Sequence, residues 1–147
     1  MASIIKTVQA QIEARVEELV ADSSVVVMSR LRGHVANNVA AAVNTNKIVV
    51  LCLPPAIGGI KPNVFSRCVA DDCKMRLRII ERPTTNPTKT NAYELVEKIL
   101  SINGYKTAYG VQVFVARAES ADPDDENFVE FELELKMTLE FPRTETL

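Results

Sequence analysis

The sequence predicts an α/β protein of the α+β type, with a single β-sheet flanked by two to three helices. Three observations favour this fold. Apolar residues recur every three or four positions near the N-terminus and again from residue 92 to 102, which is the period of an amphipathic helix. Two long segments alternate between apolar and charged residues, as strands with one buried face do. Short runs of β-branched residues supply further strands.

The chain of 147 residues has the size of one domain, so we expect a single domain over residues 1–147. Its longest apolar run, residues 48–53, is far shorter than the roughly 20 residues that cross a bilayer, so no membrane association is expected. The N-terminus lacks the pattern of a secretory signal because Glu13, Glu17 and Glu18 interrupt its apolar positions. We therefore expect the protein to be made in the cytoplasm.

The net charge of −2, from 17 basic and 19 acidic residues, gives no excess of positive charge for a phosphate backbone. Nucleic acid is therefore not expected as a tightly bound partner. The three cysteines, Cys52, Cys68 and Cys73, are too few for a disulfide framework and are typical of a reducing compartment.

The first predicted element is a helix over residues 3–20, whose start Ser3 can cap. Its opposite face is polar, so the helix is expected to cover the core, the alternative being a helix that binds a separate partner. Its apolar stripe consists of Ile5, Val8, Ile12, Val16, Leu19 and Val20.

Two short strands are predicted next, over residues 25–28 and 47–53, and Pro54-Pro55 ends the second. The alanine-rich segment 34–43 is compatible with a third helix, although it lacks strong caps. Residues 56–66, which include Gly58 and Gly59, are predicted to form an extended loop, either a surface arm or a turn between strands.

Residues 72–80 form the first alternating segment, and 83–87, with a proline at each end, terminate it. A helix follows from Asn91, with Glu94 three residues later as in a capping box, and the Asn103-Gly104 pair ends it. Its buried stripe is Leu95, Val96, Ile99, Leu100 and Ile102.

Val111, Val113 and Val115 alternate as a further strand. Residues 118–127, which carry Asp122, Asp124 and Asp125, are predicted to be a solvated acidic loop.

The second alternating segment, residues 129–141, is the most regular part of the chain. A continuous strand of this length would span about 43 Å, whereas a globule of this size has a diameter of about 38 Å. Either a bulge bends this strand, or its end lies against a neighbouring copy.

The polar faces of the two alternating segments carry opposite charges, so we expect the two strands to be neighbours. Pairing within one subunit is favoured over pairing between two. The basic face holds Lys74, Arg76 and Arg78, and the acidic face holds Glu130, Glu132 and Glu134.

The sequence offers few residues for catalysis. His34 is the only histidine, and Cys68 and Cys73 have no further ligands near them in sequence, so we expect neither a metal site nor a cofactor. No glycine-rich phosphate loop and no nucleophile-elbow motif is present. An enzyme is therefore not expected.

The order of these predicted elements resembles the tail terminators, or tail-completion proteins, of tailed bacteriophages of the lambda type. The most suggestive stretch runs from the strand at Met75 through Glu81-Arg-Pro and Asn86-Pro to the helix at residues 92–100. The resemblance extends over nearly the whole chain, as a pattern of elements more than as identical residues.

The resemblance implies a mixed sheet, which we expect to be mainly antiparallel. It implies a virion protein that forms a six-fold homo-oligomeric ring on the tail tube protein, stops tube polymerisation and docks the head-completion or neck protein. DNA would only pass through the ring. The expected contacts involve the long strand and the two loops, and our candidate residues are Gly58, Gly59, Lys61, Lys74, Arg76, Arg78, Asp122, Asp124, Asp125, Glu130, Glu132 and Glu134.

Three alternatives remain open at this stage. The first is a neck connector or a tube-associated baseplate protein, the second is a binding module unrelated to virions, and the third is a small enzyme without a recognised motif.

Overall fold

The computed structural model describes residues 3–29, 39, 41–42, 48–62, 67–82, 91–121 and 128–142. In this part of the chain, one mixed six-stranded sheet is combined with two helices, which confirms the predicted α+β fold. The elements are α1 (Ile4–Leu19), β1 (Val25–Ser29), β2 (Ile48–Cys52), β3 (Ile60–Pro62), β4 (Arg67–Glu81), α3 (Ala92–Ile99), the 3-10 turn η2 (Leu100–Ile102), β5 (Phe114–Ala121) and β6 (Val129–Pro142).

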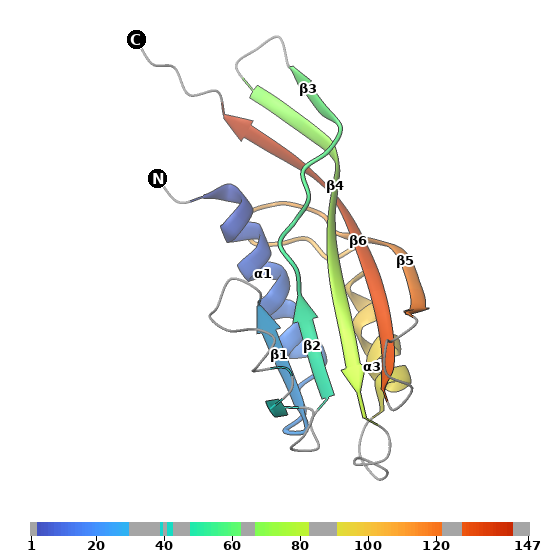
Figure 1. Ribbon diagram of the computed structural model, residues 1–147. Helices are drawn as coiled ribbons and strands as arrows, with labels where there is room; N and C mark the ends of the chain where they lie inside the picture. Colours follow the sequence, from blue (N-terminus) through green and yellow to red (C-terminus); the bar gives the residue numbers. More distant parts are fainter. Residues whose placement is uncertain are drawn as a thin grey trace.

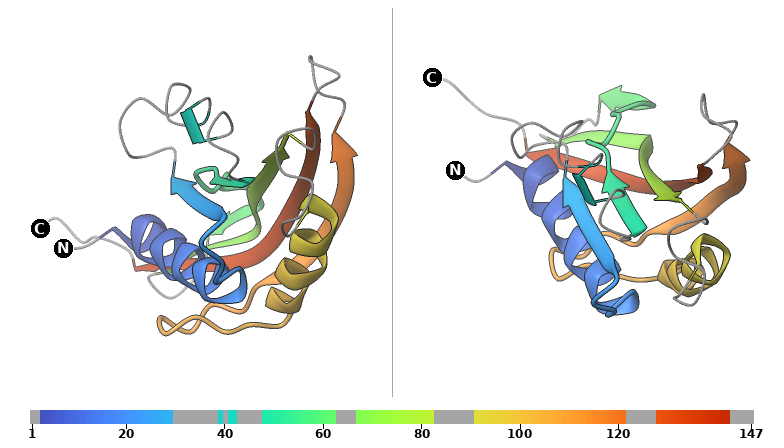
Figure 2. Two further views of the ribbon diagram at one scale, coloured as in Figure 1. Left: turned by 90° about the horizontal axis from the view of Figure 1, so that it is seen from below. Right: turned by 60° about the horizontal axis from the view of Figure 1, so that its bottom comes forward.

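The sheet has the order β1-β2-β4-β6-β5, and β3 pairs with β4 beside β2. Among the pairs of described strands, only β1–β2 is parallel, so the expectation of a mainly antiparallel sheet is confirmed. Both helices cover the same face of the sheet (Figure 2). A second, smaller apolar cluster, formed by Ala42, Val49 and Leu51, involves the opposite face of β2.

Both predicted helices start where the sequence indicated. The Ser3 hydroxyl accepts a hydrogen bond from the Lys6 N–H at 3.3 Å, and the Asn91 side chain accepts one from the Glu94 N–H at 2.9 Å. Each cap satisfies an N–H that lacks a partner inside the helix.

The core-facing stripes are buried as predicted at most positions, but Ile5 and Leu19 are only partly buried. The prediction of a buried Leu100 is wrong, because Leu100 begins the 3-10 turn η2 and its side chain is 38% exposed. Gly104, just after η2, has the left-handed φ of +84°.

The two alternating segments are adjacent antiparallel strands, as predicted. β4 has 15 residues and β6 has 14, so β4 is longer than the predicted segment 72–80. Register shifts occur in the partners of β6, between Ala70 and Cys73 of β4 and between Val115 and Arg117 of β5. β4 and β6 curve together, so the long strand is accommodated by bulges in its neighbours (Figure 1).

The ends of these strands form a projecting β-arm, which consists of β3, residues 67–72 of β4 and residues 137–142 of β6 (Figure 1). The prediction of an extended loop at 56–66 is therefore wrong for residues 60–62. These residues pair with residues 68–70 of β4, and Ala56 forms an isolated bridge with Lys74. The remainder of that predicted loop, residues 63–66, lies outside the described residues.

Two further predictions need correction. The strand predicted around Val111 and Val113 begins only at Phe114, because the two buried valines belong to a hairpin whose other side starts at Gly104. The loop predicted at 118–127 begins too early, because Ala118–Ala121 pair with β6. Residues 122–127, most of the segment 34–43 and residues 83–87 lie outside the described residues.

Candidate functional site

A charged ladder covers the outer face of β4 and β6. Arg76 lies opposite Glu134 and Arg78 opposite Glu132 in the register. The ion pairs are partly diagonal, because Glu132 contacts Arg76 at 3.4 Å and Arg78 at 3.7 Å. Lys74 contacts Glu134 at 3.5 Å. The predicted pairing of the two faces is confirmed, and it lies within one chain.

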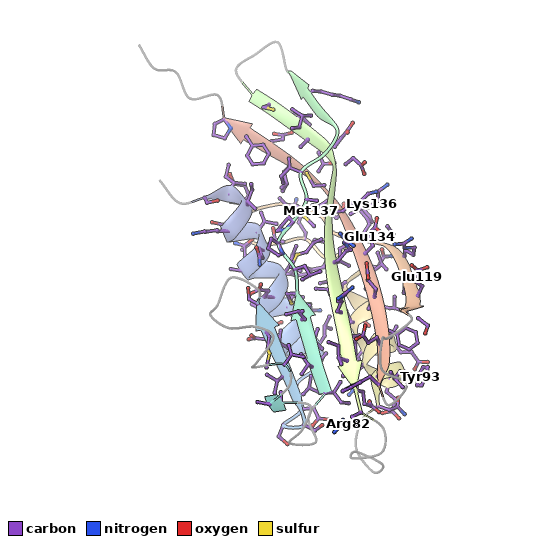
Figure 3. The ribbon with its side chains drawn as sticks, in the orientation of Figure 1. Arg82, Tyr93, Glu119, Glu134, Lys136 and Met137 are labelled. Atoms are coloured by element: carbon purple, nitrogen blue, oxygen red, sulfur yellow. The ribbon has the colours of Figure 1, made fainter. Side chains whose placement is uncertain are left out.

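Three further members of this ladder were not among the residues predicted from the sequence. Arg117 of β5 contacts Glu134 at 3.4 Å, and Lys136 contacts Asp72 at 3.7 Å. Glu119, Glu134 and Lys136 lie along the β5–β6 side of the sheet (Figure 3). Glu134 therefore lies between a cation of β4 and a cation of β5, and its side chain is only 15% exposed.

Replacing Glu134 by lysine is expected to lower the free energy of unfolding by about 1–2 kcal/mol, because it adds a third cation between Lys74 and Arg117. Urea unfolding at low salt and at 1 M NaCl measures this loss, which should shrink at high salt. Glu130→Lys is the matched control: it lies on the same face of β6, and no ion pair is described for it. Equal losses for both variants would contradict the role given to Glu134.

The glycine pair and Lys61 lie at the start of the β-arm. The carbonyl oxygens of Gly58 and Gly59 accept hydrogen bonds from the N–H groups of Asp72 and Asp71, at 3.1 and 3.3 Å. Lys61 Nζ contacts Asp71 Oδ2 at 2.7 Å, and this contact lowers the pKa of Asp71. The structure thus brings Gly58, Gly59 and Lys61 together at residues 71 and 72 of β4, directly beside the end of the charged ladder at Asp72.

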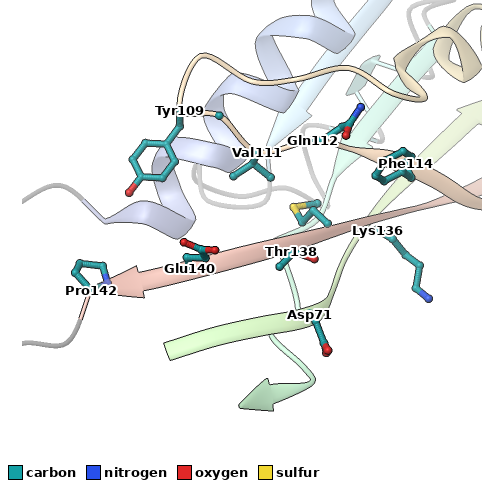
Figure 4. Close-up of a pocket in the computed structure, with 11 residues that line it drawn as sticks. Asp71, Tyr109, Val111, Gln112, Phe114, Lys136, Thr138, Glu140 and Pro142 are labelled. Carbon is teal, nitrogen blue, oxygen red and sulfur yellow. The ribbon is translucent and has the colours of Figure 1, made fainter. Parts of the chain in front are cut away.

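A groove of about 770 Å³ runs along β6 where β5 no longer pairs with it (Figure 4). β5 pairs with β6 as far as Lys136, and the chain before Phe114 turns away into the 104–113 hairpin. The N–H of Tyr109 donates to Gln11 Oε1 of α1 at 3.1 Å, which fixes the hairpin tip. This groove was not predicted from the sequence.

The lining of the groove mixes polar and apolar groups. β6 contributes Lys136, Met137, Thr138, Glu140 and Pro142, whereas Tyr109 and Phe114 stand across from them, each about half exposed. The other lining residues are Asp71, Gly110, Val111 and Gln112.

The cysteines do not form a reactive centre in the described part of the chain. Cys52 and Cys73 are buried and Cys68 is partly exposed, and all three are free thiols. Burial, and then the charges of Glu13 and Glu17, raise the pKa of the Cys52 thiol. Among the described residues, no group of three His, Cys, Asp or Glu side chains could hold a metal ion. His34, Asp122, Asp124 and Asp125 lie outside the described residues.

Glu81, at the end of β4, is an unusual buried carboxylate, because its side chain is 4% exposed. One carboxylate oxygen accepts a hydrogen bond from the Ala92 N–H at the start of α3, but Oε2 has no described partner. Burial raises the pKa of Glu81 above its ordinary value of 4.5. The folded state therefore holds this proton more tightly than the unfolded chain does, and stability falls as pH rises through the raised pKa.

Glu81→Gln is expected to raise the free energy of unfolding by about 1 kcal/mol at pH 7, because a neutral amide loses less hydration than a carboxylate. The gain should vanish below about pH 4, where the carboxyl group is protonated in both states. Urea unfolding across this pH range measures the difference, and the exposed Glu97→Gln of α3 is the control. A gain that does not change with pH would contradict this explanation.

Comparisons with known proteins do not identify a relative, because neither a scan against protein-family models nor a search of curated proteins gives a match. Within the described ranges, no helix has both the length and the apolar character needed to cross a bilayer.

Proposed function

We propose that this chain is a structural virion protein of a bacteriophage tail. It forms a ring on the head-proximal end of the tail tube, stops polymerisation of the tube protein and offers a docking surface to the head-completion or neck protein. DNA passes through the ring as cargo. This role is mechanical, so it needs protein–protein surfaces and no catalytic group.

The observation that carries this proposal is the β-arm with its open strand edges. A subunit in a closed ring contacts a neighbour on each of two different sides, and exposed strand edges are ready sites for such contacts. The arm has β3 on one side and residues 137–142 of β6 on the other. The order of helices and strands also supports the proposal, since it is the order on which the resemblance to tail terminators rests.

The charged ladder narrows the set of residues expected to contact a neighbouring subunit. Lys74, Arg76, Arg78, Glu132 and Glu134 pair with one another inside a single chain, which leaves them less available for a neighbouring subunit. Of the candidate contact residues, we favour Gly58, Gly59 and Lys61, which lie in the β-arm or directly before it, where a strand edge is open. Lys61 also pairs within the chain, with Asp71, but its side chain is 70% exposed.

A tube-assembly assay tests the function. The tail tube protein of the same phage is polymerised with and without this protein, and tube lengths are measured by negative-stain microscopy. We expect shorter tubes of a narrow length distribution when the protein is present. Tubes that grow to the same uncontrolled lengths in both samples would overturn the proposal and favour a binding module unrelated to virions.

A further inference from the structure

The two open edges of the β-arm lie on opposite sides of the same small sheet. β3 is paired on one side only, by β4, and β6 is paired beyond Lys136 only by β4. In the described part of the chain, no strand occupies either outer edge. Alternate residues of such an edge direct unpaired N–H and C=O groups outward, where another strand can pair with them.

The β6 edge is the better developed of the two, because it borders the groove. The 104–113 hairpin forms the far wall, with Tyr109 at its tip 49% exposed, and Phe114 at the head of β5 is 48% exposed (Figure 4). A strand that entered here would continue the line of β5 along β6. Main-chain pairing beside side-chain pockets is how proteins bind an added strand.

The register of the arm shows which side chains share a face. Ile60, Ala70 and Leu139 are paired across the three strands, and so are Lys61, Val69 and Glu140. Paired residues direct their side chains to the same face. Ile60 therefore lies on the apolar face, where Leu139 is buried, yet its side chain is 63% exposed. Lys61 lies on the opposite face, the face of Glu140.

We propose that the β6 groove receives β3 of a second copy of this chain. β3 and β6 are each antiparallel to β4, so they are parallel to each other. A neighbour related by rotation about an axis along the arm keeps that direction. Its Ile60 then meets the apolar face near Leu139, and its Lys61 meets Glu140 on the other face.

This contact joins two different surfaces, so repeating it builds a ring when the rotation between neighbours closes, as the proposed six-fold rotation does. β3 has three residues and carries a lysine and a proline, features that protect an edge from indiscriminate pairing. The complementary groove, with its acidic Glu140, supplies the specificity that so short a strand lacks. The inference rests on the proposed ring function and names the contact that builds the ring.

Disulfide trapping tests the contact directly. Lys61→Cys and Glu140→Cys proteins, both with Cys68→Ser to remove the nearby thiol, are mixed with tail tube protein and oxidised. We expect a cross-linked dimer between the two variants, because neighbouring strands bring their Cα atoms within disulfide reach. Lys61→Cys mixed with Glu97→Cys of α3 is the control. Cross-linking no greater than in this control overturns the proposal, and capture of tube protein by Glu140→Cys assigns the groove to that protein instead.

Charge exchange provides a second, independent test. Lys61→Glu and Glu140→Lys are each expected to weaken assembly by roughly tenfold, because each places like charges across the contact, and the double variant should recover it. Glu97→Lys of α3 is the control, since it makes the same charge change on an exposed residue outside the β-arm and the groove and should leave assembly unchanged.

The outcomes separate this inference from the proposed function. Rings or caps that form equally well in both single variants overturn the β3 contact and leave the ring function standing. Failure of the unaltered protein to assemble, alone or on tubes, overturns both.

Discussion

Leu95→Ala is expected to lower the free energy of unfolding by about 2–5 kcal/mol, well above the loss typical of a surface substitution. Leu95 is fully buried in the core cluster on the helix-covered face of the sheet. α3 has only eight residues, too few to be stable in water without packing. The substitution therefore removes apolar contacts and weakens the docking of the helix. Urea unfolding followed by circular dichroism measures the loss.

Leu100→Ala is the matched control. Leu100 follows α3 directly but its side chain is 38% exposed, so its removal should cost less than about 1 kcal/mol. Similar losses for the two leucines would show that the assigned packing of α3 on the sheet is wrong.

Gly59→Ala has the second largest expected effect, a loss of about 2 kcal/mol with disruption of the β-arm. Gly59 has a φ of +65°, which residues with a side chain rarely adopt. An added Cβ would also collide with Asp71 Oδ1 and lie 2.9 Å from the backbone nitrogen of Asp72. Because backbone cannot yield as a flexible side chain does, β3 would have to shift away from β4.

Hydrogen exchange and urea unfolding together check this prediction. Exchange should become faster in residues 60–62 and 68–72 while the helices stay protected. Gly104→Ala is the control, since Gly104 has a similar φ of +84° but nothing within 4 Å of an added Cβ. If the control loses as much stability and leaves the arm equally exposed to exchange, the close approach of Gly59 to β4 is not what requires glycine there.

The elements with a regular period could be predicted from the sequence. α1, α3, β4 and β6 each bury one face, so their apolar residues recur with a fixed spacing that the structure confirms. The charged ladder was predictable for the same reason, because the two polar faces carry opposite signs and pair in register.

The remaining elements depend on contacts that leave no period in the sequence. β3 has only three residues, and it exists because Gly58 and Gly59 approach the irregular part of β4. Val111 and Val113 alternate like strand residues and their side chains are buried, but they belong to the 104–113 hairpin and not to a strand of the sheet. The end of β5 could not be predicted, because it carries polar residues such as Glu119 and is a strand only through its pairing with β6.

The groove was hidden because its walls come from distant segments, the 104–113 hairpin and the end of β6. One signal for it was present. The predicted strand at 129–141 was longer than any strand expected to pair beside it, and β5 indeed has 8 residues against the 14 of β6. The part of β6 beyond Lys136, with which β5 does not pair, is the open edge.

Electron cryo-microscopy of tail tubes assembled in the presence of this protein tests the central claim most directly. The account predicts a ring of extra density at one end of each tube, with the β-arms of neighbouring subunits in contact around the ring. Bare tube ends, or protein bound along the tube wall without a terminal ring, would contradict it.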